Sequence, residues 1–219
     1  MIQIVAPYVP NLLSGFLMTI QLSVVTLAIA TPVALAIAVS REMGPRALGL
    51  ALAVLVNIVR LLPAVIVLYF VFYGAPQLGL RMHPMTAAII GLATMGAAYM
   101  SEDIRGGLSA IDRGQIAAIR ALGLPMGHGL RRILLPQALP LIVPPWMTRA
   151  IIMVKGTSLA SMISVADLTA EATRASSITY QPYIFLLLAG GLYLALSGVL
   201  VGAQALIERH LKRRYRRTF

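Results

Sequence analysis

Long apolar runs separated by short polar segments make up most of the chain. Crossing the hydrocarbon core of a bilayer takes roughly 20 mostly apolar residues in helical form. Five segments meet this requirement, at about Leu12–Val39, Leu48–Tyr73, Met85–Met100 with a continuation through Ile104, Leu139–Leu159 and Tyr183–Ile207. The pattern therefore predicts an all-α membrane protein with five transmembrane helices.

Small residues and prolines mark particular places within these runs. The first and third runs are rich in alanine and glycine. Such residues let helix backbones approach closely in lipid, so we expect these two runs to form packing faces. Prolines interrupt three runs, at Pro32, Pro63 and the pair Pro144-Pro145. Membrane helices tolerate prolines when neighbouring groups satisfy the carbonyls that they free.

Composition agrees with a lipid environment. The chain of 219 residues is 59% hydrophobic and only 11% charged, and its mean hydropathy is +0.86. A soluble domain has about 45–50% apolar and about 25% charged residues. The absence of cysteine excludes disulfides, thiolate metal sites and a cysteine nucleophile. Met1 to Asn11 lacks the basic segment of a removable signal peptide.

The basic residues gather on one side of the five-span arrangement. Basic loops mark the cytoplasm, so the N-terminus is expected outside and the C-terminus inside. The other side carries only Arg81 and Arg174. Thirteen of the 18 basic residues lie on the cytoplasmic side: Arg41, Arg46, Arg105, Arg113, Arg120, Arg131, Arg132, Arg209, Lys212, Arg213, Arg214, Arg216 and Arg217.

A net charge of +11 also raises the possibility of nucleic-acid binding. The basic tail directly follows the last apolar run, however, and there it is more simply explained as an anchor to anionic lipids. We therefore expect membrane lipids and no nucleic acid as partners of the tail.

The segment Gly114–Pro136 is a polar, basic insert in this apolar chain. Asp112 can cap a helix that begins near Gly114, and Gly123 with Pro125 should end it. The apolar residues of this helix are Ile116, Ile119 and Leu122. In a second short helix, Leu130, Ile133 and Leu134 lie opposite Arg131 and Arg132. By themselves, two amphipathic helices could equally lie in the membrane interface.

One spacing in this segment is specific. Gly123 is followed after nine residues by Ile133 and then by Leu135-Pro136. This G-x9-I-x-L-P pattern resembles the EAA loop of bacterial ABC importer permeases, the loop that docks on the ATPase subunit.

Further motifs place the resemblance in the polar amino-acid branch of these permeases, the histidine, glutamine, arginine and opine type. They run in order from about residue 12 to 168. The motifs are Leu12-Leu13-Ser14-Gly15 with Thr19 and Leu22-Ser23, Ala98-Tyr99 with Glu102 and Arg105-Gly106-Gly107, Gly114-Gln115, Leu122-Gly123, Leu135-Pro136-Gln137-Ala138, and Lys155-Gly156-Thr157-Ser158-Leu159.

The resemblance implies a type I importer-like fold, a single permease domain at 1–219 and a cytoplasmic docking loop at about 105–138. The residues implied to dock on the ATPase are Gly114, Gln115, Ala117, Ala118, Gly123, Ile133, Leu135 and Pro136. Two positions depart from the family pattern. Ala117 stands where the family usually has Glu, and the family's RGTP reads Arg60-Leu61-Leu62-Pro63.

Three basic residues fall within or near spans. A charge at mid-bilayer costs roughly 2.5–3.5 kcal/mol on insertion scales. Arg60 and Arg149 can snorkel to the interface, the preferred interpretation for Arg149. Lys155 is deeper and lies beside Thr157 and Ser158, so the sequence predicts that these residues, with Arg60, line the solute path or a gate. A further expectation is that Arg105 pairs with Glu102 or Asp103.

No catalytic motif is present. The chain has no Gly-Lys dipeptide and hence no P-loop, and His83, His128 and His210 are scattered over both sides. We expect no enzyme activity, metal site or cofactor in this chain; the resemblance implies that a partner ATPase binds ATP and Mg²⁺.

The hypothesis is thus the transmembrane subunit of an ATP-driven importer in the bacterial inner membrane, carrying a polar amino acid or related zwitterion. Its implied partners are an ABC ATPase, a second copy or a homologous permease, and a periplasmic solute-binding protein that meets the outer face, including Ser161–Pro182. The alternative is a stand-alone secondary transporter or channel. Such proteins often carry inverted repeats and intramembrane acids. No repeat is visible here, and we expect no acid in the interior of a span, since Glu102 and Asp103 sit where the third span reaches the cytoplasm.

Overall fold

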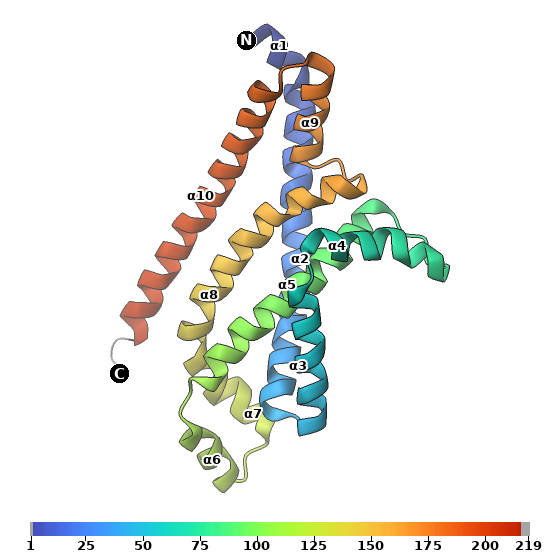
Figure 1. Ribbon diagram of the computed structural model, residues 1–219. Helices are drawn as coiled ribbons and strands as arrows, with labels where there is room; N and C mark the ends of the chain where they lie inside the picture. Colours follow the sequence, from blue (N-terminus) through green and yellow to red (C-terminus); the bar gives the residue numbers. More distant parts are fainter. Residues whose placement is uncertain (1, 216–219) are drawn as a thin grey trace.

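The computed structural model describes residues 2–215, and every regular element in that range is helical (Figure 1). Arg216 and Arg217 of the basic tail lie outside the described residues. In chain order the elements are α1 (Ile2–Val5), η1 (Ala6–Tyr8), α2 (Val9–Met43), α3 (Arg46–Leu61), α4 (Ala64–Tyr69), η2 (Phe70–Gly74), η3 (Ala75–Leu78), α5 (Pro84–Ser109), α6 (Arg113–Ala121), α7 (Met126–Gly129), η4 (Leu130–Leu134), α8 (Leu135–Gly156), η5 (Thr157–Ile163), α9 (Leu168–Thr179) and α10 (Pro182–Tyr215).

The expected second span is broken. Four helical segments of the described chain are long and apolar enough to cross a membrane, and a fifth is reached only if α3 and the following segment to Leu78 count together. These two pieces bend by 105°. Leu62, with ψ 139°, and Pro63, with ψ 137°, are both extended. The physical reason is Pro63, which disfavours helical geometry at the preceding residue. The run from Leu48 to Tyr73, which Pro63 was expected to interrupt, is therefore not one continuous helix.

The other prolines that the sequence places within spans lie inside continuous helices. Pro32 is within α2, and Pro140, Pro144 and Pro145 are within α8. Helix α2 keeps its course past Pro32 while Ala30 and Ala34 on either side are fully buried in the packing with α5 and α8. Interhelical packing can thus hold a helix together across a proline that would otherwise weaken it.

Small residues bring α5 close to its neighbours, as the sequence predicted. One core cluster contains alanines of α2, α5 and α8. A Cβ added at Gly96 would lie 2.5 Å from Met153 Sδ, and one added at Gly107 would lie 2.4 Å from Ile142 Cγ1. The backbone of α5 therefore lies directly against side chains of α8, and at Gly107 a Cβ would also lie 3.2 Å from the Ile142 backbone nitrogen.

The first helix of the polar insert forms as expected. Gly114 N donates to Asp112 Oδ1 at 2.7 Å, which caps α6, and the helix ends at Ala121 before Gly123 with φ +64°. Its apolar side is only partly covered, because Ile119 is buried whereas Leu122 is 72% exposed.

The second helix of the insert is not a separate element. Met126–Ile163 is one continuous helical stretch of 38 residues, so α7 and η4 lead directly into the fourth span. The sequence prediction of an independent short helix was wrong here. The apolar side of this segment continues into that of α8, and nothing after Leu134 stops the helix. As a result, any force applied at α7 acts on the same helix that crosses the core.

Different helices and turns lie at the two ends of the molecule (Figure 1). The helix α6, the turn between α2 and α3, and the C-terminal end of α10 lie at one end, away from the chain's N-terminus. The start of α2, helix α9 and the start of α10 lie at the other end. The basic segments named from the sequence thus collect at the first end, in agreement with the predicted charge asymmetry.

Candidate functional site

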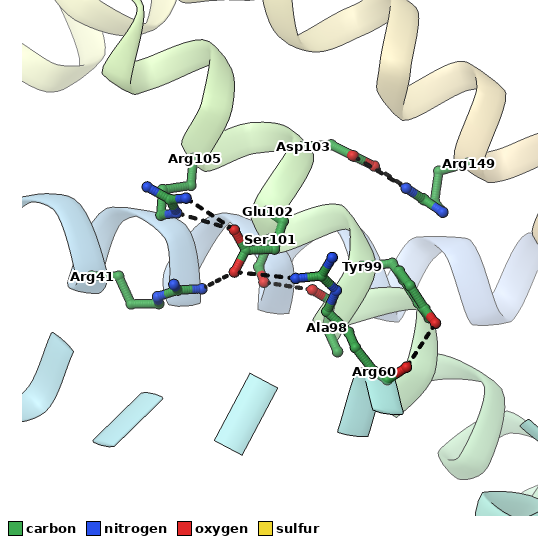
Figure 2. A network of polar contacts seen from close by, with 9 residues as sticks. All are labelled: Arg41, Arg60, Ala98, Tyr99, Ser101, Glu102, Asp103, Arg105 and Arg149. Atoms are coloured by element: carbon green, nitrogen blue, oxygen red, sulfur yellow. Dashed lines mark hydrogen bonds and ion pairs between the residues drawn. The ribbon is translucent and has the colours of Figure 1, made fainter. Parts of the chain in front are cut away.

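A cluster of ionic side chains lies on α5 and joins it to two earlier helices. The Glu102 carboxylate pairs with Arg41 of α2 and accepts from Arg105 Nη2 at 3.1 Å. Arg60 Nη1 of α3 lies 3.7 Å from Glu102 Oε1. Figure 2 shows the three guanidinium groups converging on this single carboxylate. The expected Arg105 partner is confirmed. Both acids, Glu102 and Asp103, lie in the C-terminal part of α5, which runs on to Ser109.

Next to this cluster, Arg149 of α8 forms its own ion pair. Arg149 Nε and Nη2 donate to Asp103 at 3.1 and 3.4 Å. The Arg149 guanidinium also lies 4.8 Å from the centroid of the Tyr99 ring, and that of Arg60 lies 5.5 Å from it. Tyr99 Oη donates to the Arg60 carbonyl at 3.0 Å (Figure 2). Both arginines, for which snorkelling was considered from the sequence, thus find anionic and aromatic partners on α5.

A cavity of about 370 Å³ opens beside this pair. It lies between the broken second span, α5, α8 and η5. Its walls are apolar except for Tyr99 and Arg149, and no carboxylate lines it. The lining residues are Leu62, Pro63, Ala64, Leu92, Met95, Gly96, Tyr99, Arg149, Ile152, Met153, Gly156 and Leu159. An apolar pocket with one guanidinium can hold a small anion-bearing molecule.

The structure brings only part of the predicted solute path together. Arg60 joins the Glu102 cluster. Lys155 is exposed and Ser158 is half-buried, and Ser158 Oγ donates to the Lys155 carbonyl at 2.8 Å. Thr157 is buried and donates to the Val154 carbonyl at 2.7 Å. Neither Lys155 nor the two hydroxyl residues line the cavity.

Sequence reasoning missed Asp103, Arg149 and Tyr99 as one unit. The available signal was a pair of opposite charges, one near the end of the third apolar run and one in the fourth. Unpaired charges inside a bilayer are costly, so such charges are expected to pair. That signal did not say which basic residue would reach which acid. The contact depends on the close approach of α5 to α8 at Gly96 and Gly107.

The implied docking residues lie around α6 and the start of the long helical stretch. Ala117 and Ala118 are exposed, whereas Ile133, Leu135 and Pro136 are half-buried. A second cleft, of about 360 Å³, separates α6 from the ends of α2 and α5 and includes Glu42, Ala117 and Arg120. Gly129 contacts Ile119 so closely that a Cβ there would lie 2.7 Å from Ile119 Cγ2. Helix α6 is therefore held against α7 by a glycine contact.

A buried carboxyl group lies at the opposite end, outside the candidate spans. Asp167 is fully buried and accepts from Ala170 N at 2.9 Å, which caps α9. Tyr193 Oη donates to it at 3.3 Å, and Thr19 Oγ1 accepts from the neighbouring Leu168 N at 3.2 Å. Burial raises the pKa of Asp167 to about 6, although the hydrogen bonds from Ala170 N and Tyr193 Oη oppose the shift. Within residues 2–215 no three His, Cys, Asp or Glu side chains gather as metal ligands.

Comparison with known proteins gives consistent matches. The family model described as "Binding-protein-dependent transport system inner membrane component" matches residues 30–213. The arginine transport system permease protein ArtQ of Bacillus subtilis is 32% identical over 94% of each chain. The octopine transport system permease protein OccM of Rhizobium meliloti is 33% identical, covering 94% of this chain and 88% of its own.

A solved structure has the same architecture. The crystal structure of an amino acid ABC transporter with histidines contains a chain that is 29% identical. It superposes with a TM-score of 0.84 and covers 94% of this chain and 96% of its own.

Proposed function

Because the chain belongs to the family of binding-protein-dependent transport system inner membrane components, we propose that its helices form the path of a polar amino acid or related zwitterion. The chain is the multi-pass inner-membrane permease of an ABC importer and not its ATPase, and it holds no cofactor. The observation that carries the choice of solute is similarity over nearly the whole chain to an arginine permease and an octopine permease.

Permeases of this class work with an ATPase and a binding protein. We propose that the ATPase docks on the segment 105–138 of a single domain spanning 1–219. The contact residues would be Gly114, Gln115, Ala117, Ala118, Gly123, Ile133, Leu135 and Pro136. The unbroken helix from Met126 to Ile163 supports this arrangement, because movement of α7 is passed directly to the fourth span. ATPase closure would then rock the rigid helices around the solute path.

The charge asymmetry supports an orientation with the N-terminus outside and the C-terminus inside. In that orientation the segment Ser161–Pro182, which includes α9, faces the periplasmic binding protein. The basic end of α10 faces anionic lipid. The long apolar surfaces of α2 and α10, largely exposed in the single chain, would face lipid and a second copy or a homologous permease.

The cavity beside Arg149 is the best candidate for the solute within this chain. The Arg60 guanidinium, 5.5 Å from the centroid of the Tyr99 ring, adds positive charge nearby. Lys155, Thr157 and Ser158, which neighbour the lining residues Gly156 and Leu159 along the chain, remain proposed residues of the path or gate. Rearrangement of η5 would be needed for Thr157 to reach a solute, because its hydroxyl is bonded within the helix.

Uptake into proteoliposomes tests the proposal. The permease is reconstituted with its ATPase and the binding protein, and labelled L-amino acids are supplied outside. We expect accumulation of at least one amino acid with ATP inside and none with a non-hydrolysable analogue. The permease alone should carry nothing.

The same assay distinguishes the importer from the alternative function, a stand-alone secondary transporter. A secondary transporter would accumulate solute when the purified chain is given only an ion gradient. Uptake under that condition, without ATPase, would overturn the importer assignment.

A further inference from the structure

We propose that Arg149, held by Asp103 and Tyr99, binds the carboxylate of the solute, and that this cavity selects amino acids without a positively charged side chain. The inference rests on the proposed function and adds to it the residue that recognises the solute and the class of side chain that fits.

Arg149 has donors left to offer. Its Nε and Nη2 are bonded to Asp103, whereas Nη1 has no hydrogen-bond partner within the described chain. The side chain is 30% exposed and lines the cavity, but Asp103 does not. A guanidinium is planar and can bind two carboxylates along different edges. Asp103 therefore orients the group while its remaining edge stays available to a ligand.

The surroundings favour an anion even though Arg149 is already paired. The linked clusters contain four guanidinium groups, from Arg41, Arg60, Arg105 and Arg149, against the two carboxylates of Glu102 and Asp103. The local charge is therefore positive. Arg60 Nε is buried without a hydrogen-bond partner in the described chain. The carboxylate of a solute in the cavity would lower this excess of positive charge.

The rest of the cavity disfavours a cation. Its remaining walls are apolar side chains, including Met95 and Met153, whose flexible thioethers adapt to different shapes. No lining residue carries a carboxylate that could pair with an ammonium or guanidinium side chain. Burying such a charge without a partner, beside an already positive cluster, is strongly unfavourable. The chemistry thus points to amino acids with uncharged side chains, unlike the arginine named for one relative.

Asp103 is a positioning residue in this scheme. Its bidentate bond sets the plane of the Arg149 guanidinium, and the Tyr99 ring supports one face of it. Loss of the Asp103 charge should weaken solute binding while the maximal ATPase rate stays near normal. A merely structural role would change both together.

The test uses the permease–ATPase complex in lipid nanodiscs, without the binding protein, so that only the transmembrane path can bind. Equilibrium dialysis is carried out with each of the common L-amino acids, and then with the carboxamide of every one that binds. We expect binding of at least one uncharged amino acid, weaker binding of its carboxamide, and no binding of L-arginine or L-lysine.

Variants then assign the residues. Arg149→Gln should raise Kd for the bound amino acid at least about tenfold, as loss of a charge-assisted hydrogen bond predicts. Arg149→Lys should be intermediate, because it keeps charge but not the planar fork. Asp103→Asn should raise Kd with little change in maximal ATPase rate. Asp103→Glu, which keeps the charge, should retain part of the affinity that Asp103→Asn loses. Arg174→Gln, an exposed arginine on α9, is the control and should bind as the wild type does.

The outcomes separate the two proposals. Unchanged Kd in Arg149→Gln, or equal binding of L-arginine, overturns the inference while ATP-driven uptake of an amino acid by the wild type still upholds the function. If the wild-type system carries no amino acid at all, the proposed function fails. The comparison of each acid with its carboxamide uses the wild-type protein, so it stays decisive even if Arg149→Gln does not assemble.

Discussion

At the scale of single residues, Gly123 sets the geometry of the proposed docking loop. It follows α6 with φ +64°, and a Cβ there would meet nothing within 4 Å. The cost of a side chain is therefore backbone strain alone, about 1–2 kcal/mol.

We predict that Gly123→Leu uncouples transport, because the strain changes the path from α6 to α7. ATPase stimulation by loaded binding protein should fall several-fold. Gly127→Leu is the matched control, since Gly127 also has free space around it but does not have a positive φ. Equal stimulation in the two variants would contradict the prediction.

Asp167 should make stability depend on pH. Its pKa rises from 3.8 to about 6 on folding because the carboxyl is buried. The folded protein thus binds more protons than the unfolded chain between these values, and the contribution of this group to stability falls as pH rises through about 6.

Asp167→Asn keeps an oxygen for the bond from Ala170 N and removes the buried charge. We expect its melting temperature at pH 7.5 to equal or exceed that of the wild type, with a smaller decline between pH 5 and 7.5. Thermal unfolding in detergent across this range measures both. A variant less stable at pH 7.5 but with an unchanged pH dependence would show that the charged form is favoured in the fold.

At the scale of elements, close backbone contact holds α5 against α8. Two adjacent glycines allow a matched test. A Cβ at Gly107 would lie 2.4 Å from Ile142 Cγ1 and 3.2 Å from its backbone nitrogen, whereas one at Gly106 would meet nothing within 4 Å.

We predict that Gly107→Ala destabilises the protein by about 1–3 kcal/mol, the usual cost of overpacking, and that Gly106→Ala is nearly neutral. The measurement is the melting temperature of each purified variant. Similar values for the two would mean that α5 and α8 can separate without cost.

Element prediction from the sequence succeeded where local composition was sufficient. Four apolar runs and the capped helix after Asp112 were found, because length, hydropathy and an N-cap are local properties. The behaviour of prolines was not local. Pro32 and Pro63 are the same residue in similar apolar runs, yet only Pro63 lies at a 105° bend. Contacts from neighbouring helices decide between a tolerated and a broken helix.

At the scale of the whole molecule, Glu102 links α2, α3 and α5 through three arginines. Removal of its charge would leave three guanidinium groups near one another with no anion between them. Breaking such a partly buried arrangement is destabilising because the remaining charges are left uncompensated.

We predict that Glu102→Gln lowers the melting temperature by several degrees and reduces the yield of assembled permease–ATPase complex. Glu42→Gln, at the exposed end of α2, is the stability control and should melt as the wild type does. Equal melting temperatures of the two variants would refute the interpretation of Glu102 as the link between the three helices.

The sequence by itself determined the membrane character, the family resemblance, the concentration of basic residues at one end and the candidate docking loop. These depend on composition, order and spacing along the chain, which folding does not change. The tertiary structure alone decided which charges meet. Arg149 and Asp103 lie 46 positions apart, on helices whose approach depends on glycine contacts that are not visible in either segment separately. The cavity beside them is lined by the bend at Leu62, Pro63 and Ala64 together with α5 and α8, and this is a property of packing among distant residues.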